Sequence, residues 1–156
     1  MSARIVNQRT TSKYIDILGS RMHYIDEGSG EPIVFLHGNP TSSYIWRNII
    51  PYLSDGYRCI APDLIGMGNS DKPNIDYTFQ DQYKYFCAFI DALHLDNITF
   101  VLHDWGAALG SLYAKEHPEQ IATLAFLEAI IRPWKWSYLK WNYRIGFWLL
   151  RQPIIG

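Results

Sequence analysis

The tetrapeptide His103-Asp104-Trp105-Gly106 constrains the fold of this chain more than any other segment. An apolar run precedes it at residues 98–102, and a stretch with helical patterning follows it at residues 107–117. This order predicts a buried strand, a sharp turn and a helix, with the Asp104 side chain at the apex of the turn. An aspartate with an ordinary pKa of about 3.9 is ionised at neutral pH. Such a carboxylate can attack an alkyl carbon without the help of a base and form an ester with it.

Strand and helix patterns alternate along the rest of the chain. We expect a hairpin of two short strands around Gly19-Ser20, followed by strands that alternate with helices. The expected strands are 14–18, 21–26, 32–36, 57–61, 98–102 and 121–127, and the expected helices are 41–53, one that is capped by Thr78 and runs to about 93, and 106–117. This order is typical of an α/β fold with a mostly parallel, doubly wound sheet. Ligands of such sheets bind at the carboxyl ends of the strands, where Asn39, Asp104 and Glu128 fall.

Length, charge and cysteine content limit the classes of function. The 156 residues suffice for one domain with a core, and a net charge of −1 gives no reason to expect a nucleic-acid partner. Cys59 and Cys87 lie in apolar stretches without metal-ligand spacing, so we expect buried thiols in a reducing compartment. Residues 1–13 are polar and do not resemble a signal peptide, which favours a cytoplasmic protein. The apolar run 145–150 is too short to span a bilayer.

The last part of the chain is basic and aromatic. Residues 129–156 contain five basic residues and no acidic ones. Residues 134–150 could lie on an anionic membrane surface as an amphipathic helix. We favour the alternative in which the aromatic side chains cover a binding site and the charges face solvent. We therefore do not expect a membrane partner.

Three segments together resemble the haloalkane dehalogenases of the α/β-hydrolase superfamily. They are residues 37–44, 63–73 and 103–106, and the resemblance covers nearly the whole chain as far as Pro133. It implies an α/β-hydrolase fold in which residues 1–132 form the N-terminal part of the core and residues 133–156 begin a helical cap, where the fold is truncated. It also implies hydrolytic dehalogenation of a small haloalkane to an alcohol and a halide, with water as the only co-substrate and with neither cofactor nor metal. The oligomeric state stays open.

The resemblance implies roles for four residues. Asp104 resembles the nucleophile that becomes an alkyl ester, in the turn known as the nucleophile elbow. The side chains of Asn39 and Trp105 resemble a halide-binding pair, since an amide N–H and an indole N–H can stabilise a leaving halide. The backbone N–H groups of the same two residues would face the ester oxyanion. Glu128 resembles the acid that orients a histidine base.

The histidine base is where this chain departs from the pattern of the family. In the family the base lies on a loop after the last strand, and none of the five histidines of this chain suits that role: His23, His37, His94, His103 and His117. We therefore expect alkylation of Asp104 without hydrolysis of the ester. We also expect residues 123–127 to form an open apolar strand edge, which lowers solubility.

Several alternatives remain open. Asp104 could be a helix N-cap, Asn39 a turn residue and Glu128 an exposed loop residue. The chain as a whole could be an epoxide hydrolase, a coelenterazine-type luciferase, or a non-catalytic fragment or pseudoenzyme. An epoxide hydrolase would usually have a bulky aromatic residue in place of Asn39. Structural hydrogen bonding explains three other polar residues better than catalysis does: His37, Asp63 and Asp71.

Overall fold

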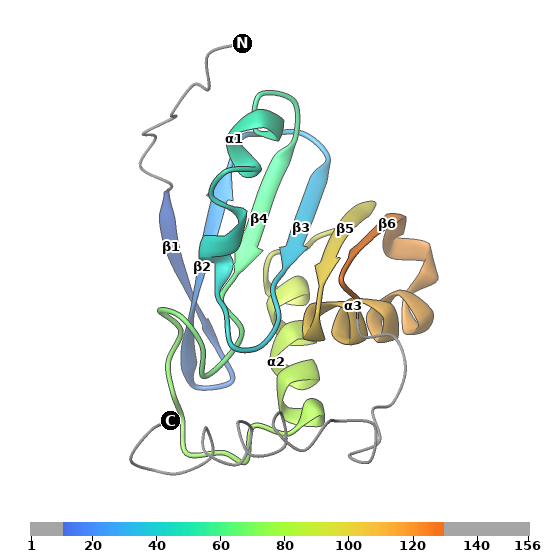
Figure 1. Ribbon diagram of the computed structural model, residues 1–156. Helices are drawn as coiled ribbons and strands as arrows, with labels where there is room; N and C mark the ends of the chain where they lie inside the picture. Colours follow the sequence, from blue (N-terminus) through green and yellow to red (C-terminus); the bar gives the residue numbers. More distant parts are fainter. Residues whose placement is uncertain (1–10, 130–156) are drawn as a thin grey trace.

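A computed structural model describes residues 11–129 of the chain. Its elements are, in chain order, β1 (Ser12–Ile17), β2 (Ser20–Glu27), β3 (Pro32–Leu36), η1 (Ser43–Trp46), α1 (Ile50–Leu53), β4 (Arg58–Pro62), α2 (Phe79–Ala92), β5 (Ile98–His103), α3 (Trp105–Glu116), η2 (Pro118–Gln120) and β6 (Ile121–Leu127). The strands form one sheet in the order β1-β2-β4-β3-β5-β6 (Figure 1). β2 pairs antiparallel with β1 and β4, whereas β4, β3, β5 and β6 are parallel. The expected α/β fold with a mostly parallel sheet is confirmed.

Helices cover both faces of the sheet. Side chains alternate between the two faces along a strand, so in β3 Val34 and Leu36 belong to one core, and Ile33 and Phe35 to another. The first core packs α2 and α3 against the sheet, and the second packs η1 and α1 against the opposite face. Consecutive apolar residues in β3 therefore reflect burial on both faces, as in other parallel sheets.

α2 begins where the sequence predicts. Thr78 Oγ1 accepts a hydrogen bond of 3.1 Å from the Asp81 N–H, and the Asp81 carboxylate accepts one of 2.9 Å from the Thr78 N–H. This reciprocal capping box satisfies N–H groups that the first turn of a helix leaves unpaired. The helix that follows buries Phe86 and Phe89 completely, so its start and its inner face are both fixed by local sequence.

The single helix expected over residues 41–53 is wrong. Its place is taken by η1 and the single turn α1, and Ser42 Oγ caps η1 by accepting a hydrogen bond from the Tyr44 N–H. Pro51 explains the break, because it has no N–H to donate to the Arg47 carbonyl and its ring crowds that carbonyl. The segment nevertheless buries apolar side chains against the sheet, which is the feature that its patterning reflects.

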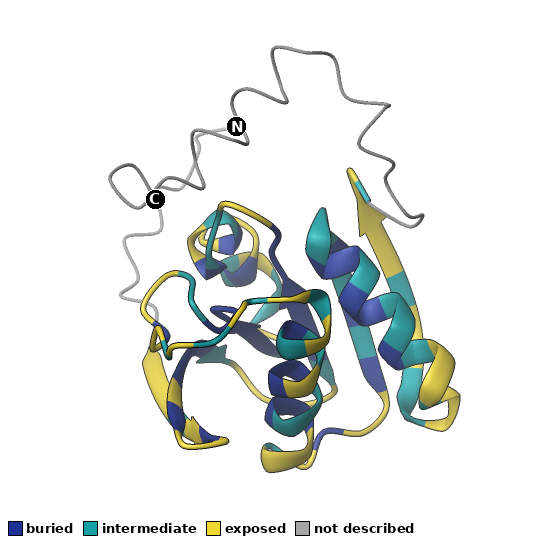
Figure 2. Ribbon diagram, turned by 90° about the horizontal axis from the view of Figure 1, so that it is seen from below, coloured by how far each residue is buried: buried dark blue, intermediate teal, exposed yellow. Residues whose placement is uncertain are grey.

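β6 is an edge of the sheet within residues 11–129. Much of this strand is exposed (yellow in Figure 2), and Phe126 and Leu127 are 49% and 41% exposed. The open apolar edge expected over residues 123–127 is therefore present, and low solubility stays a prediction. The helical cap expected at residues 133–156 and the aromatic tail at 134–150 lie outside the described residues.

Both cysteines are free thiols, with Cys59 buried and Cys87 half-buried. Burial raises the pKa of the Cys59 thiol to about 11, which keeps it protonated and unreactive at neutral pH. Across residues 11–129, no three side chains of metal-binding type come together. The same part of the chain contains no helix of the length and apolarity needed to cross a membrane.

Candidate active site

Asp104 lies between the end of β5 and the start of α3, as predicted. Its φ of 52° and ψ of −120° fall in a region of backbone space that residues other than glycine rarely adopt. It occupies the N-cap position of α3, yet its side chain accepts no hydrogen bond from the helix. The N-cap interpretation is therefore wrong. The strained turn instead presents the carboxylate to the loop that follows β3.

Two glycines make the close approach around Asp104 possible. A Cβ atom added at Gly38 would lie 2.1 Å from Asp104 Oδ1, and one added at Gly106 would lie 2.6 Å from the Leu36 carbonyl oxygen. Both distances are well inside the 3.0 Å that real Cβ atoms respect. The loop after β3 and the first turn of α3 can therefore pack together only because neither glycine has a side chain.

The backbone of Asn39 contacts the Asp104 carboxylate directly. Its N–H donates a hydrogen bond of 2.9 Å to Asp104 Oδ1. The two residues meet because β3 and β5 are parallel neighbours, so the loops after them leave the sheet at the same edge. A backbone N–H aimed at this oxygen can polarise the carbonyl group of an ester formed on Asp104. The side chain of Asn39 is exposed at this edge.

His37 fixes the loop that carries Asn39. It is fully buried, its Nδ1 lies 2.8 Å from the Gly38 carbonyl oxygen, and its Nε2 accepts a hydrogen bond of 3.0 Å from the Leu64 N–H. Because a carbonyl oxygen only accepts and an N–H only donates, Nδ1 carries the proton and Nε2 is unprotonated. Burial lowers the pKa of His37, which keeps the ring neutral. The structural role expected for His37 is confirmed.

Trp105 is the first residue of α3 and is half-buried. Its ring packs against Phe79, the first residue of α2, with the ring centroids 6.4 Å apart and the planes at 60°. Phe79 in turn stacks on Tyr83, whose hydroxyl donates a hydrogen bond to the carboxylate of Glu116 in the last turn of α3. The sequence indicates Trp105 as a candidate site residue. It does not indicate Phe79, because the contact between the two depends on how α2 lies against α3.

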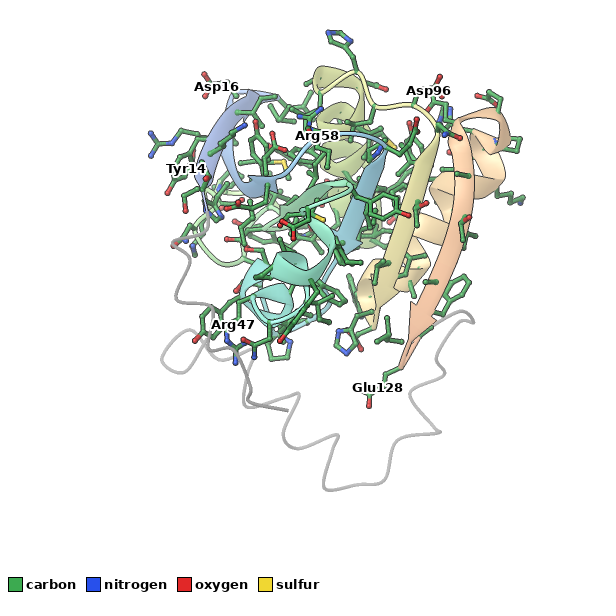
Figure 3. All side chains as sticks on the ribbon, turned by 90° about the horizontal axis from the view of Figure 1, so that it is seen from above. Tyr14, Asp16, Arg47, Arg58, Asp96 and Glu128 are labelled. Carbon is green, nitrogen blue, oxygen red and sulfur yellow. The ribbon has the colours of Figure 1, made fainter. Side chains whose placement is uncertain are left out.

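Glu128 follows β6 and has a φ of 46°. Since β5 and β6 pair in parallel with His103 opposite Leu127, Asp104 and Glu128 leave the sheet at the same edge. Figure 3 shows Glu128 beyond the end of β6. Its Oε2 lies 3.6 Å from His103 Nε2, and its side chain is 90% exposed. The structure thus brings Glu128 close to the residue that precedes Asp104, a contact that only the strand register reveals.

Asp63 ties the long loop after β4 to its surroundings, as predicted. Its buried carboxylate accepts hydrogen bonds of 2.7 and 2.8 Å from the backbone N–H groups of Ser43 and Asn69, and lies 2.8 Å from His23 Nδ1. Burial by itself raises the pKa of this carboxyl, but the hydrogen bonds outweigh burial and lower the pKa to about 2. Asp71 has the structural role expected of it, since its carboxylate accepts a backbone N–H of β2 at 2.7 Å.

Comparison with known proteins identifies the family. Residues 31–153 match the alpha/beta hydrolase fold family. The chain belongs to this family. Among similar α/β-hydrolases, a haloalkane dehalogenase of Mesorhizobium japonicum is 49% identical over 146 residues, covering 91% of this chain and 47% of that protein. A haloalkane dehalogenase of Sphingobium indicum is 48% identical over 130 residues, covering 80% of this chain and 44% of that protein.

Solved structures agree with these sequence matches. The haloalkane dehalogenase DatA of Agrobacterium tumefaciens superimposes with a TM-score of 0.83 at 43% identity, over 92% of this chain and 50% of that one. The haloalkane dehalogenase DbeA of Bradyrhizobium elkani gives a TM-score of 0.82 at 44% identity, over 94% and 52% of the two chains. This α/β-hydrolase chain therefore spans about half the length of the relatives that it matches. The resemblance to haloalkane dehalogenases is confirmed.

Within residues 11–129 of this α/β-hydrolase, no histidine forms a hydrogen bond with Asp104. The nearest in sequence is His103, whose Nε2 faces Glu128 and whose Nδ1 is buried without a hydrogen-bond partner in this part of the chain. His23 and His37 are held by the hydrogen bonds of buried groups. The other two histidines lie just after the ends of α2 and α3: His94 and His117. Whether a histidine serves Asp104 as a base therefore stays a prediction.

Proposed function

We propose that this chain carries the nucleophile of a haloalkane dehalogenase, with Asp104 as the residue that attacks the carbon–halogen bond. One observation supports this proposal above the others: an aspartate stands at a strained turn after β5 and receives the backbone N–H of Asn39 on one carboxylate oxygen. A carboxylate needs no base to displace a halide from an alkyl carbon. The substrate would be a small halogenated alkane, and the co-substrate would be water.

The contacts of Asp104 suggest how its two oxygens divide the reaction. Oδ1 accepts the Asn39 N–H, so Oδ2 is the oxygen free to attack. In the proposed step the Oδ2–carbon bond forms, the carbon–halogen bond breaks, and the halide leaves with the bonding electrons. Oδ1 becomes the carbonyl oxygen of the ester and keeps its hydrogen bond, which is the arrangement needed to stabilise an oxyanion during hydrolysis.

The leaving halide requires N–H donors next to Asp104. We assign this role to the side chains of Asn39 and Trp105, because Asn39 already touches the carboxylate through its backbone and Trp105 is the next residue in the chain. Both donors are neutral, so they can stabilise a developing negative charge without forming an ion pair with Asp104 before the reaction. We assign the backbone N–H of Trp105, together with that of Asn39, to the oxyanion of the second step.

Hydrolysis of the ester requires a base that activates water. We assign Glu128 as the acid that orients this base, because it leaves the sheet at the same edge as Asp104. Within residues 11–129 no histidine forms a hydrogen bond with the Asp104 carboxylate, so we expect the ester on this chain to persist. A cytoplasmic location also belongs to this proposal, because two free thiols, one of them buried, suit a reducing compartment.

The test is to incubate the chain with a primary bromoalkane and to measure intact mass, peptide mass and released bromide. We expect one alkyl group per chain, located on Asp104, and an equal amount of bromide. Asp104→Asn should stay unmodified, whereas the matched control Asp91→Asn, which changes an exposed aspartate of α2, should react like the parent chain. An unmodified parent chain would favour the non-catalytic alternative. Bromide release that continues over many turnovers would show that a base is present after all.

A further inference from the structure

A second set of side chains, which comprises a nucleophile, an imidazole and a carboxylate, lies at the opposite edge of the sheet from Glu128. Ser12 Oγ is 3.0 Å from His23 Nε2, and His23 Nδ1 is 2.8 Å from Asp63 Oδ2. β1, which carries Ser12, is separated from β5 by β2, β4 and β3. Figure 3 shows Tyr14 of β1 and Glu128 at opposite sides of the molecule. The two sets of residues are therefore spatially distinct.

The proton positions in this set follow from its hydrogen bonds. Asp63 is a carboxylate that accepts two backbone N–H groups, and an ionised carboxylate can only accept. His23 must therefore present a protonated Nδ1 to Asp63. In the neutral imidazole Nε2 is then the acceptor, and its neighbour is the hydroxyl of Ser12. A buried carboxylate that fixes the tautomer of an imidazole in this way is the arrangement that activates serine nucleophiles.

Solvent exposure rises from the carboxylate to the hydroxyl, as a serine nucleophile with buried partners requires. Asp63 and His23 are 1% and 3% exposed, whereas Ser12 is exposed on an outer strand. The ring of Tyr14 meets the His23 imidazole edge-on with centroids 5.2 Å apart, and the guanidinium of Arg21 lies 4.6 Å from the same tyrosine ring. Tyr14 is 48% exposed, so it offers an aromatic surface next to the Ser12 hydroxyl.

We propose that Ser12, His23 and Asp63 form a second nucleophilic site, which takes small aryl esters of carboxylic acids. In the first step Ser12 Oγ forms a bond to the carbonyl carbon, and its proton passes to His23 Nε2. The ester C–O bond then breaks, and the same proton passes to the departing aryloxide, which leaves as a phenol. Water then forms a bond to the acyl carbon while one of its protons passes to His23 Nε2. The bond from Ser12 Oγ to the acyl carbon breaks, the proton returns to Ser12 Oγ, and the carboxylic acid leaves. This site is independent of the dehalogenase proposal, because it uses none of the residues around Asp104.

The test follows acetylation by p-nitrophenyl acetate with peptide mass spectrometry, which reads each serine separately. Ser29 is the matched control, because it is an exposed serine in the turn after β2. General-base assistance accelerates such reactions by about a hundredfold or more, so we expect Ser12 to react roughly a hundredfold faster than Ser29. Ser12→Ala should remove the fast acetylation, and Ser29→Ala should leave it unchanged. Acetylation of Ser12 at the rate of Ser29 would overturn the proposal.

A second comparison separates activation by His23 from simple exposure. His23→Gln removes the imidazole, so acetylation of Ser12 should fall to the rate of Ser29. If that variant does not fold, the parent chain in urea gives the same comparison, because unfolding separates Ser12 from His23 and should equalise the two serines. An unchanged preference for Ser12 under either condition would exclude the imidazole as base. The acetyl group on Ser12 and an alkyl group on Asp104 are read on different peptides, so either proposal can fail without the other.

Discussion

The backbone N–H of Asn39 donates to Oδ1 of Asp104, although 65 residues separate them in the chain. This bond makes the two carboxylate oxygens inequivalent before any substrate arrives. Oδ1 is oriented by the loop after β3, and Oδ2 is the oxygen that would attack in the proposed reaction. In the proposed reaction the same bond would be kept in the ester, where it could stabilise the oxyanion of the second step.

The strained backbone of Asp104 predicts a conflict between stability and reactivity. A φ of 52° with a ψ of −120° costs a residue with a side chain roughly 1–3 kcal/mol, and glycine adopts this conformation freely. Asp104→Gly should therefore be about 1 kcal/mol more stable toward unfolding than Asp104→Ala, which keeps the strain. Urea unfolding of the two variants measures the difference, and both should lose the alkyl adduct. Equal stability of the two would show that the turn is not strained.

Gly38 should tolerate no side chain. The Cβ atom of an alanine would lie 2.1 Å from Asp104 Oδ1, so Gly38→Ala must displace either the carboxylate or the loop. We expect loss of more than about 1 kcal/mol of stability, as for overpacked sites, and alkylation slowed at least about tenfold, since the displacement breaks the Asn39 bond. Gly56→Ala is the control, because a Cβ there meets nothing within 4 Å. Similar melting and alkylation of the two variants would contradict this reading of the site.

Local patterns in the sequence predict most of the elements but not the contacts between them. Thr78 marks the start of α2 by residue type, and Asp104 lies at the turn expected between β5 and α3. The prediction of one helix over residues 41–53 is wrong because the apolar pattern reflects burial, whereas Pro51 interrupts the helical backbone.

Contacts that depend on register or on returning loops are not visible in a single sequence. His103 meets Glu128 only because β5 and β6 pair with a particular alignment. Asp63 reaches His23 across 40 residues through the antiparallel pairing of β2 with β4. The strain at Asp104 is also invisible to propensity, because tertiary contacts impose it against the local preference of aspartate.

Phe79 should act as a positioning residue for Trp105. Its ring lies between the indole and Tyr83, and an aromatic pair contributes about 1 kcal/mol beyond its buried area. Phe79→Leu keeps an apolar side chain but loses this contact, so we expect alkylation of Asp104 to slow by about fivefold. Phe126→Leu, on the exposed edge strand, should react like the parent chain. A rate for Phe79→Leu equal to the parent would show that the indole is positioned by other neighbours.

The buried carboxylate of Asp63 should make stability depend on acid. Its pKa is about 2 in the folded chain against an ordinary value of 3.8. Stability from this group is therefore complete above pH 3.8 and is lost as the pH falls toward 2, by about 2 kcal/mol in total. Asp63→Asn should lose this dependence and should be destabilised at neutral pH. Urea midpoints across this range, compared with the exposed control Asp91→Asn, measure the effect.

His37 should give a second pH dependence, at higher pH and in the same direction. Burial lowers its pKa in the folded chain below the ordinary 6.5, so the unfolded chain binds the proton more readily. Stability from this group is complete above pH 6.5 and declines as the pH falls below that value. Protonation of Nε2 removes the acceptor for the Leu64 N–H. The Leu64 N–H is then unpaired and points at the new N–H of the ring, which is also a donor. Asp63, His103 and Asp104 also act on the charge of this ring.

Two variants isolate the effect of His37. His37→Gln offers an acceptor to the Leu64 N–H, and His37→Asn offers a donor to the Gly38 carbonyl, so each retains one of the two hydrogen bonds and neither titrates. Both should cost about 1–3 kcal/mol at pH 8 and slow the alkylation of Asp104, because the loop that holds Asn39 is released. Both should also flatten the loss of stability below pH 6.5, whereas His94→Gln, at an exposed helix end, should leave it intact. A parental slope in His37→Gln and His37→Asn would mean that another histidine controls this range.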